Sequence, residues 1–98
     1  MKKLLMLAVI VTLNCSAYCD RGITASGEPV RAGICAMDML NGVMVPFGSR
    51  VTLPDGTVLT VTDRFGDGRS NCLDIFMETE QECWEWGRRN VECRVELP

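Results

Sequence analysis

The sequence predicts an all-β domain that closes into a small barrel and carries one short helix. Short apolar runs recur along the chain between turn-forming residues, and one segment has the signature of a helix start. Ninety-eight residues allow a single domain with a modest core. We expect about six short strands, and closure into a barrel removes the exposed edges that such strands would otherwise leave.

Turn-forming residues bound the predicted strands. Pro54-Asp55-Gly56 separates two of them, because the proline presets φ and the glycine permits a positive φ. Asn41-Gly42 predicts a second tight turn. In the last predicted strand apolar and polar residues alternate, which is typical of a half-buried strand. The expected strands cover residues 32–37, 50–53, 57–62, 72–76 and 90–97.

One helix is predicted after residue 79. Segment 79–82 begins with threonine and ends with glutamate, the spacing of a capping box. The helix should continue through Trp86 and end at Gly87, where a left-handed residue is easily accommodated. We expect Cys83 and Trp84 to face the core.

Residues 1–17 read as a secretory signal, which leaves residues 18–98 as the domain. Lys2 and Lys3 precede an apolar run over residues 4–13, and cleavage after Ala17 fits the small residues there. The run is too short to cross a bilayer comfortably, so no stable membrane span is expected. The protein should then be secreted, periplasmic or associated with the cell wall. The alternatives are a buried first strand and a lipid attached to Cys15.

Six cysteines in a short exported chain predict at least one intramolecular disulfide. The sequence does not choose among the 15 possible pairings. Zinc is the competing explanation, but the chain has no histidine and no Cys-x-x-Cys pair. We therefore expect no metal and no cofactor.

The charge of the chain disfavours a nucleic-acid partner. Beyond residue 17, eight arginines face 13 acidic residues, which leaves a net charge of about −5. Phosphate binding needs a net basic face. The absence of histidine also excludes Ser-His-Asp and Cys-His catalysis, so acid–base chemistry by carboxyl groups is what remains.

Three aspartates end or interrupt apolar runs, namely Asp38, Asp63 and Asp74. Asp74 is the best candidate for a general acid, because apolar neighbours desolvate a carboxyl group and raise its pKa. Its alternative role is to hydrogen-bond a neighbouring loop. Residues 63–74 also have part of the spacing of a calcium-binding loop, although phenylalanine stands where one ligand is expected and a strand precedes the segment.

Several short motifs together resemble the three-aspartate domain, the double-psi β-barrel of membrane-bound lytic transglycosylase A and of small secreted wall enzymes. Order, spacing and residue type agree over roughly residues 13–97. The motifs are Thr24-Ala25-Ser26-Gly27, Ala36-Met37-Asp38, Val45-Pro46-Phe47-Gly48-Ser49, Val61-Thr62-Asp63, Leu73-Asp74-Ile75-Phe76 and Trp86-Gly87-Arg88-Arg89.

The resemblance implies a six-stranded double-psi barrel that cleaves peptidoglycan glycan strands as a monomer, without a cofactor. Asp74 would be the acid and base, and Asp63 and Asp38 would hold the sugar or tune Asp74. The resemblance further implies substrate-binding roles for Thr24, Ser26, Gly27, Arg64 and Gly66. The chain departs from the family pattern in one place, where Asp63-Arg64-Phe65-Gly66 stands for Asp-Thr-Gly-Gly. The cleavage site after Ala17 also falls within a stretch that resembles the family's first strand.

The chain is similar to a neighbouring family as well, the barrel of rare lipoprotein A and of expansins. That family usually has histidine where this chain has Asp38, so Asp38 favours the three-aspartate domain. Two other function classes stay open. One is a wall-binding module without catalysis, and the other is a small disulfide-rich secreted interaction protein.

Overall fold

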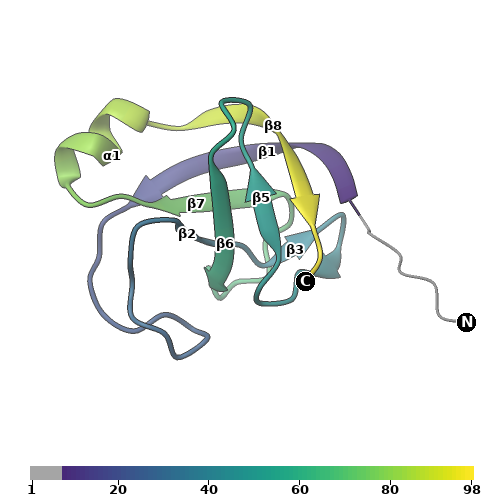
Figure 1. Cartoon of the computed structure of the whole chain (residues 1–98), viewed down its shortest axis with the longest axis horizontal. Coiled ribbons are helices and arrows are strands. Elements are labelled where there is room, and N and C mark those ends of the chain that lie inside the picture. Colours follow the sequence, from purple (N-terminus) through teal and green to yellow (C-terminus); the bar gives the residue numbers. More distant parts are fainter. Residues whose placement is uncertain (1–7) are drawn as a thin grey trace, which may run out of the picture.

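Six strands close into a barrel in the order β1-β7-β2-β6-β5-β8 (Figure 1). The computed structural model describes residues 8–98. This arrangement confirms the predicted fold class, an all-β closed barrel of six strands with one short helix. The barrel strands are β1 (Ala8–Tyr18), β2 (Ile34–Ala36), β5 (Arg50–Thr52), β6 (Val58–Asp63), β7 (Cys72–Phe76) and β8 (Arg89–Glu96).

The barrel mixes parallel and antiparallel pairs. β1 runs parallel to β7, and β2 runs parallel to β6, whereas the four remaining neighbours are antiparallel. A parallel pair cannot be joined by a tight hairpin, so its connections are long. The longest connection between two barrel strands, from β1 to β2, swings out at the lower left of Figure 1. Long loops at the end of a barrel can line a binding site.

β1 is the longest strand and bridges two neighbours. Ala8–Cys15 pairs with β8, and Asn14–Tyr18 pairs with β7. Leu13 and Cys15 are fully buried in the core. Residues 8–17 of the predicted secretory signal therefore form a barrel strand here, while residues 1–7 lie outside the described part. Cleavage after Ala17 would remove nearly all of β1, so the barrel and the predicted cleavage site compete for the same residues.

The turn predicted at Asn41-Gly42 is present. It joins β3 (Met39–Leu40) and β4 (Val43–Met44), a two-stranded hairpin apart from the barrel. Asn41 has φ 50° and Gly42 has φ 79°. A two-residue hairpin turn with both residues at positive φ matches the twist of its strands, and asparagine followed by glycine is the preferred pair there.

None of the six cysteines, all of which lie within the described residues, forms a disulfide. The predicted disulfide is therefore wrong for this structure. Cys15, Cys35 and Cys93 are buried in the core among aliphatic side chains. A buried free cysteine packs as a small apolar residue, and that role explains these three without a cross-link.

The helix α1 (Glu80–Trp86) begins and ends as predicted. The Thr79 side chain accepts from the Glu82 N–H, the Glu82 side chain accepts from the Thr79 N–H, and the Gly87 N–H donates to the Cys83 carbonyl. The prediction that Trp84 faces the core is wrong, because 85% of this residue is exposed. No helix within residues 8–98 is long and apolar enough to span a membrane.

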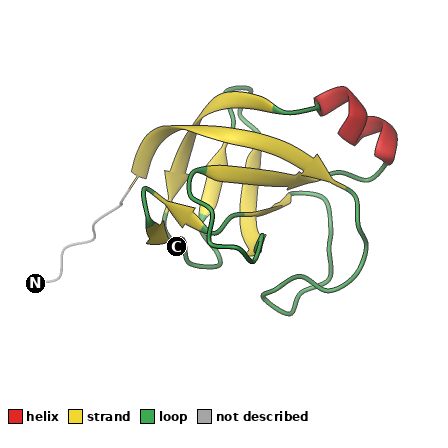
Figure 2. Cartoon of the chain, turned by 180° about the vertical axis from the view of Figure 1, so that it is seen from behind, coloured by secondary structure: helices red, strands yellow, loops and turns green. Residues whose placement is uncertain are grey.

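α1 lies outside the barrel, so only one edge of it touches strands (Figure 2). Trp86 makes the contact, and its Nε1 donates to the Cys15 carbonyl at 3.3 Å. Residues 83 and 86 are three apart and share a face, whereas residue 84 is turned away by about 100°. This spacing explains why Trp84 points to solvent.

Removal of residues 1–17 should unfold the protein, because it leaves β7 and β8 without the strand between them and exposes the core that Leu13 and Cys15 cover. A chain that starts at Tyr18 should show no cooperative unfolding transition in urea. A chain that starts at Ala8 should unfold cooperatively. Equal stability of the two chains would show that the barrel closes without β1.

Candidate active site

The register of four strands places Ser16, Asp74, Ala36 and Asp63 in one row across the barrel. Asp74 on β7 pairs with Ser16 of β1 on one side and with Ala36 of β2 on the other. Ala36 in turn pairs with Asp63 of β6, after a bulge at Cys35/Ala36. Neighbouring strands lie about 4.8 Å apart, so the two aspartate backbones are separated by about 10 Å. The side chain between them is a single methyl group.

A cavity of about 290 Å³ opens beside this row. Asp74, Ala36 and Asp63 line one side of it, and residues 20–23 of the loop between β1 and β2 line another. Tyr18, Val30, Arg64 and Phe65 complete the wall. Ala36 itself is almost fully covered. A ligand in this cavity would contact both aspartates.

Asp74 is half-buried, with one strong donor. Ser16 Oγ donates to Asp74 Oδ1 at 2.9 Å. Desolvation by burial raises the pKa of Asp74, and the Ser16 hydrogen bond and the Arg88 charge offset only part of that effect. A carboxyl group with a raised pKa keeps its proton to higher pH than an ordinary aspartate, which is what a general acid requires.

Asp63 is held by three donors from its surroundings. Its Oδ2 accepts from the Tyr18 hydroxyl at 3.0 Å, and its Oδ1 accepts from the backbone N–H groups of Ala25 and Arg64 at 2.9 Å each. Burial and the nearby Asp63 charge raise the pKa of Tyr18, so its hydroxyl stays protonated and donates. Asp63 is therefore an oriented carboxyl group that ties β1, the following loop and β6 together.

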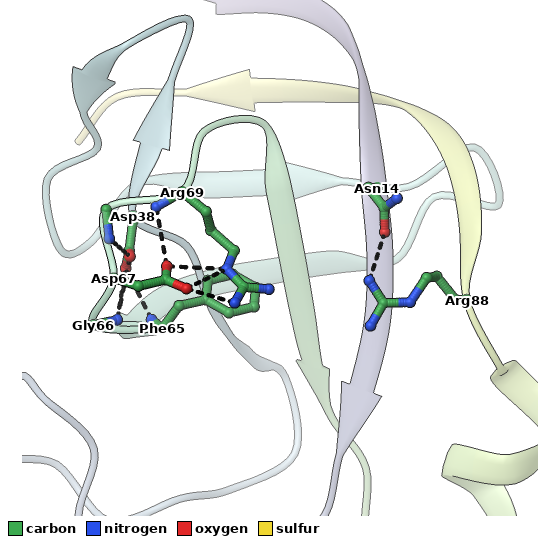
Figure 3. A network of polar contacts seen from close by, with 8 residues as sticks. Asn14, Asp38, Phe65, Gly66, Asp67, Arg69 and Arg88 are labelled. Carbon is green, nitrogen blue, oxygen red and sulfur yellow. Dashed lines mark hydrogen bonds and ion pairs between the residues drawn. The ribbon is translucent and has the colours of Figure 1, made fainter.

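Asp38 lies outside the cavity that Asp63 and Asp74 line. It is 3% exposed. Its oxygens accept from the N–H groups of Phe65 at 2.8 Å, Gly66 at 3.2 Å and Gly68 at 2.8 Å (Figure 3). The carboxyl group thus shapes the loop that follows β6, as an anion does in a nest of backbone donors.

The residues predicted to bind substrate divide between the cavity and its supports. Arg64 lines the cavity, donates from Nη1 to the Met37 carbonyl at 2.9 Å, and lies 3.9 Å from the centre of the Phe47 ring. Gly66 lines a separate cavity of about 200 Å³ next to Asp38. The structure thus brings Arg64 to the two aspartates and leaves Gly66 outside.

The other three predicted binding residues fix the loop between β1 and β2. Thr24 is buried, and its hydroxyl donates to the Glu28 carbonyl at 2.8 Å. The Ser26 N–H donates to the Thr62 carbonyl at 3.0 Å, and Gly27 turns with φ 95°. None of Thr24, Ser26 and Gly27 lines the large cavity. They hold the loop whose residues 20–23 do.

Sequence reasoning missed several residues of the site, namely Ser16, Tyr18, Ala36, Phe65, Val30 and residues 20–23 of the loop. Ser16 and Tyr18 lay at the edge of the predicted secretory signal. The sequence nonetheless contains a pattern that could have identified them. Over residues 13–18 apolar and polar residues alternate, as in a half-buried strand, with Asn14, Ser16 and Tyr18 on the polar side.

Metal ligands do not converge in the described residues. Residues 8–98 contain no group of three or more cysteine, aspartate or glutamate side chains placed to hold an ion. The segment 63–74, which has part of the spacing of a calcium-binding loop, does not form one. Its first and last residues, Asp63 and Asp74, lie on β6 and β7, and β2 runs between these two strands. Asp67 instead forms an ion pair with Arg69.

No model of a known protein family matches the chain, and no curated protein matches it. The likeness to the three-aspartate domain consequently rests on the short motifs of the sequence. The structure adds to it a closed six-stranded barrel with mixed strand directions.

The same substitution should have opposite effects on stability at Asp38 and at Asp74. Asp38→Asn places an amide N–H against buried backbone donors, which should lower the free energy of unfolding by about 1–3 kcal/mol. Asp74→Asn should raise it at pH 7. The raised pKa of Asp74 means that the folded state binds its proton more tightly, so stability falls as pH rises through that pKa and an ionised Asp74 is unfavourable.

Urea unfolding of both variants at pH 7 and pH 3 measures this difference. The gain of Asp74→Asn should shrink at pH 3, where the wild-type Asp74 is itself largely protonated. Asparagine at position 74 keeps an oxygen that can accept from the Ser16 hydroxyl, so loss of this hydrogen bond does not contribute to the measured difference. A loss of stability at pH 7 equal to that of Asp38→Asn would instead make Asp74 a structural carboxylate.

Proposed function

We propose that the protein is a lytic transglycosylase that cleaves peptidoglycan, with Asp74 as both general acid and general base. One observation carries the proposal, a half-buried carboxyl group of raised pKa on the wall of an open cavity. Of the other two carboxyl groups that line the cavity, Asp63 is occupied by three protein donors and Asp20 is exposed to solvent. Asp74 is therefore the one desolvated carboxyl group left to transfer a proton, which suits a reaction that needs only one.

The proposed reaction takes place between N-acetylmuramic acid and N-acetylglucosamine. Asp74 protonates the glycosidic oxygen, and the bond from that oxygen to C1 of the muramic acid breaks. The C6 hydroxyl of the same sugar then attacks C1 and closes a 1,6-anhydro ring. The hydroxyl proton passes to Asp74, which regains its starting state. No water enters, so no second carboxyl group is needed to activate one, unlike in the common glycoside hydrolases.

The neighbours of Asp74 fit this cycle. Desolvation favours the protonated form that begins the reaction, and the Ser16 hydroxyl stabilises the carboxylate after the proton has left. Asp63, whose two oxygens are fixed, can hold sugar hydroxyls or face the positive charge that develops at C1. Asp38 takes part only through the shape of the loop at 65–68.

The proposed substrate also agrees with the charge of the protein. The sugar rings, hydroxyls and N-acetyl groups of a glycan strand are uncharged, so the net negative charge of the chain does not oppose contact with them. We further propose that the protein acts outside the cytoplasm, at the cell wall, as a monomer on glycan strands.

The second candidate is a wall-binding module without catalysis. The observation that favours it is that two of the three expected aspartates, Asp38 and Asp63, have their oxygens taken up by protein donors. In this second proposal the cavity binds sugars, and Asp74 transfers no proton.

The wild-type protein should release 1,6-anhydro-muropeptides from purified peptidoglycan, and Asp74→Asn should reduce the rate by at least about 10²–10⁴-fold. Activity should fall as pH rises through the raised pKa of Asp74, since the reaction starts from the protonated acid. Ser16→Ala removes a donor to the carboxylate, raises the pKa of Asp74 further, and should move this fall to higher pH. Mass spectrometry of the soluble products measures each rate.

Asp55→Asn is the matched control, because Asp55 lies in an exposed turn and its Oδ1 accepts from the Thr57 N–H, a contact that asparagine can keep. Its rate should equal that of the wild type. Equal rates for Asp74→Asn and the wild type would exclude Asp74 as the acid. Binding of peptidoglycan by a wild type that forms no anhydro product would favour the binding module.

A further inference from the structure

The aromatic ring of Phe65 stands on the wall of the cavity that holds Asp63 and Asp74. Phe65 is half-buried, and it follows directly on β6 and Arg64. It occupies a position where the resembled family pattern has a glycine, so this ring is a feature of this chain. Nothing in the proposed proton transfer uses it.

Three backbone hydrogen bonds hold the ring's attachment in place. The Phe65 N–H donates to Asp38 Oδ1 at 2.8 Å, and the N–H groups of Gly66 and Gly68 donate to Oδ2 of the same carboxyl group (Figure 3). Asp38 is almost fully buried and cannot move away from them. The loop therefore presents Phe65 at a fixed position at the cavity.

A cation covers one face of the ring. The Arg69 guanidinium carbon lies 4.5 Å from the centre of the Phe65 ring. Arg69 is held in turn by Asp67, with Nε 3.0 Å from each carboxylate oxygen. These contacts lower the pKa of Asp67 to about 2, so the pair stays charged at ordinary pH. With Arg69 on one side, only the other face of Phe65 is free for a ligand.

The ion pair itself is exposed, with 42% of the Arg69 side chain and 53% of the Asp67 side chain accessible. Exposed pairs add little to folding stability. Its clearest effect is local, because it holds a guanidinium against one face of the Phe65 ring. The Asp38 carboxyl group thus holds the backbone of Phe65, and the Asp67–Arg69 pair lies against its side chain.

We propose that Phe65 is a stacking platform for one sugar ring of the glycan, next to the bond that Asp74 would cleave. This inference rests on the proposed function for the class of ligand. The apolar C–H face of a pyranose ring packs on an aromatic face, while its hydroxyls reach polar groups around it. Here Asp63, Asp74 and Arg64 line the same cavity as Phe65 and supply such polar groups.

The composition of the cavity supports a neutral sugar over an anionic ligand. Asp20, Asp63 and Asp74 line it, against the two cations Arg21 and Arg64. Arg21 also pairs with Glu78, and Arg64 donates to the Met37 carbonyl, so neither is free of protein contacts. At about 290 Å³ the cavity is at the lower end of small-molecule sites and suits about one or two sugar residues of a longer strand.

The test is the binding of soluble glycan fragments of alternating N-acetylglucosamine and N-acetylmuramic acid, measured by isothermal titration calorimetry, with the muramic acid carboxyl groups converted to amides so that the fragments are neutral. Asp74→Asn serves as the parent protein, so that no turnover occurs. Phe65→Ala in this parent should weaken binding about tenfold, the scale of one aromatic contact. Phe65→Tyr should bind within about twofold of the parent. Trp84→Ala, which removes an exposed aromatic ring outside the cavity, should bind as the parent does.

Phe65→Leu guards against a folding defect, because it keeps an apolar side chain of similar bulk but has no aromatic face. It should unfold in urea as the parent does and still bind several-fold more weakly. Unchanged binding by Phe65→Leu and Phe65→Ala would overturn the platform, and so would a parent that binds no glycan.

The outcome is separable from that of the proposed function. Glycan binding that depends on Phe65, in a wild type that releases no anhydro product, would support the platform and contradict the lytic reaction. Release of anhydro product with a KM that Phe65→Leu leaves unchanged would support the lytic reaction and contradict the platform.

Discussion

The pairing of Ala36 with Asp74 on one side and with Asp63 on the other is the constraint on which the site depends. β2 has only three residues, and its last one sets both pairings. A slip of one residue in β7 would turn Asp74 to the opposite face and bring Leu73 or Ile75, both core residues, to the cavity. The apolar residues on either side of Asp74 therefore protect the register, since burying them fixes where the carboxyl group points.

A second carboxyl group organises the site without facing it. Asp38 replaces water for three backbone N–H groups of the loop after β6, and so gives that loop one conformation. Asp63 does the same for the loop between β1 and β2 through the Ala25 N–H. The side-chain oxygens of Asp38 and Asp63 thus accept hydrogen bonds that hold the loops of the barrel in place. The third aspartate, Asp74, is partly desolvated, and desolvation raises its pKa. Perturbed pKa values are common among catalytic groups.

Local features of the chain were predictable, because their causes are local. Pro54-Asp55-Gly56 and Asn41-Gly42 specify their turns by backbone preference, and the helix at 80–86 follows from its capping residues. From the sequence we expected Asp63 to act near Asp74, but we did not predict that both residues pair with Ala36 of β2. The register of that pairing depends on strands far apart in the chain, which no local pattern encodes.

The failures have physical reasons as well. An apolar run behind two lysines fits a secretory signal and a barrel strand equally, so Ser16 and Tyr18 were not weighed as site residues. Cysteines were taken as disulfide partners, although a buried thiol also fills a small core. Asp38 was expected at the substrate, because its backbone partners lie 27–30 residues away and cannot be seen from its neighbours.

The central claim is that a glycan binds in the cavity beside Asp74, and a crystal structure of Asp74→Asn with a bound glycan fragment tests it most directly. The account predicts a glycosidic oxygen within hydrogen-bond distance of the side-chain amide that this substitution introduces, with the flanking sugar between Asp63 and Phe65. A glycan seated on another face of the barrel, with this cavity empty, would contradict the account.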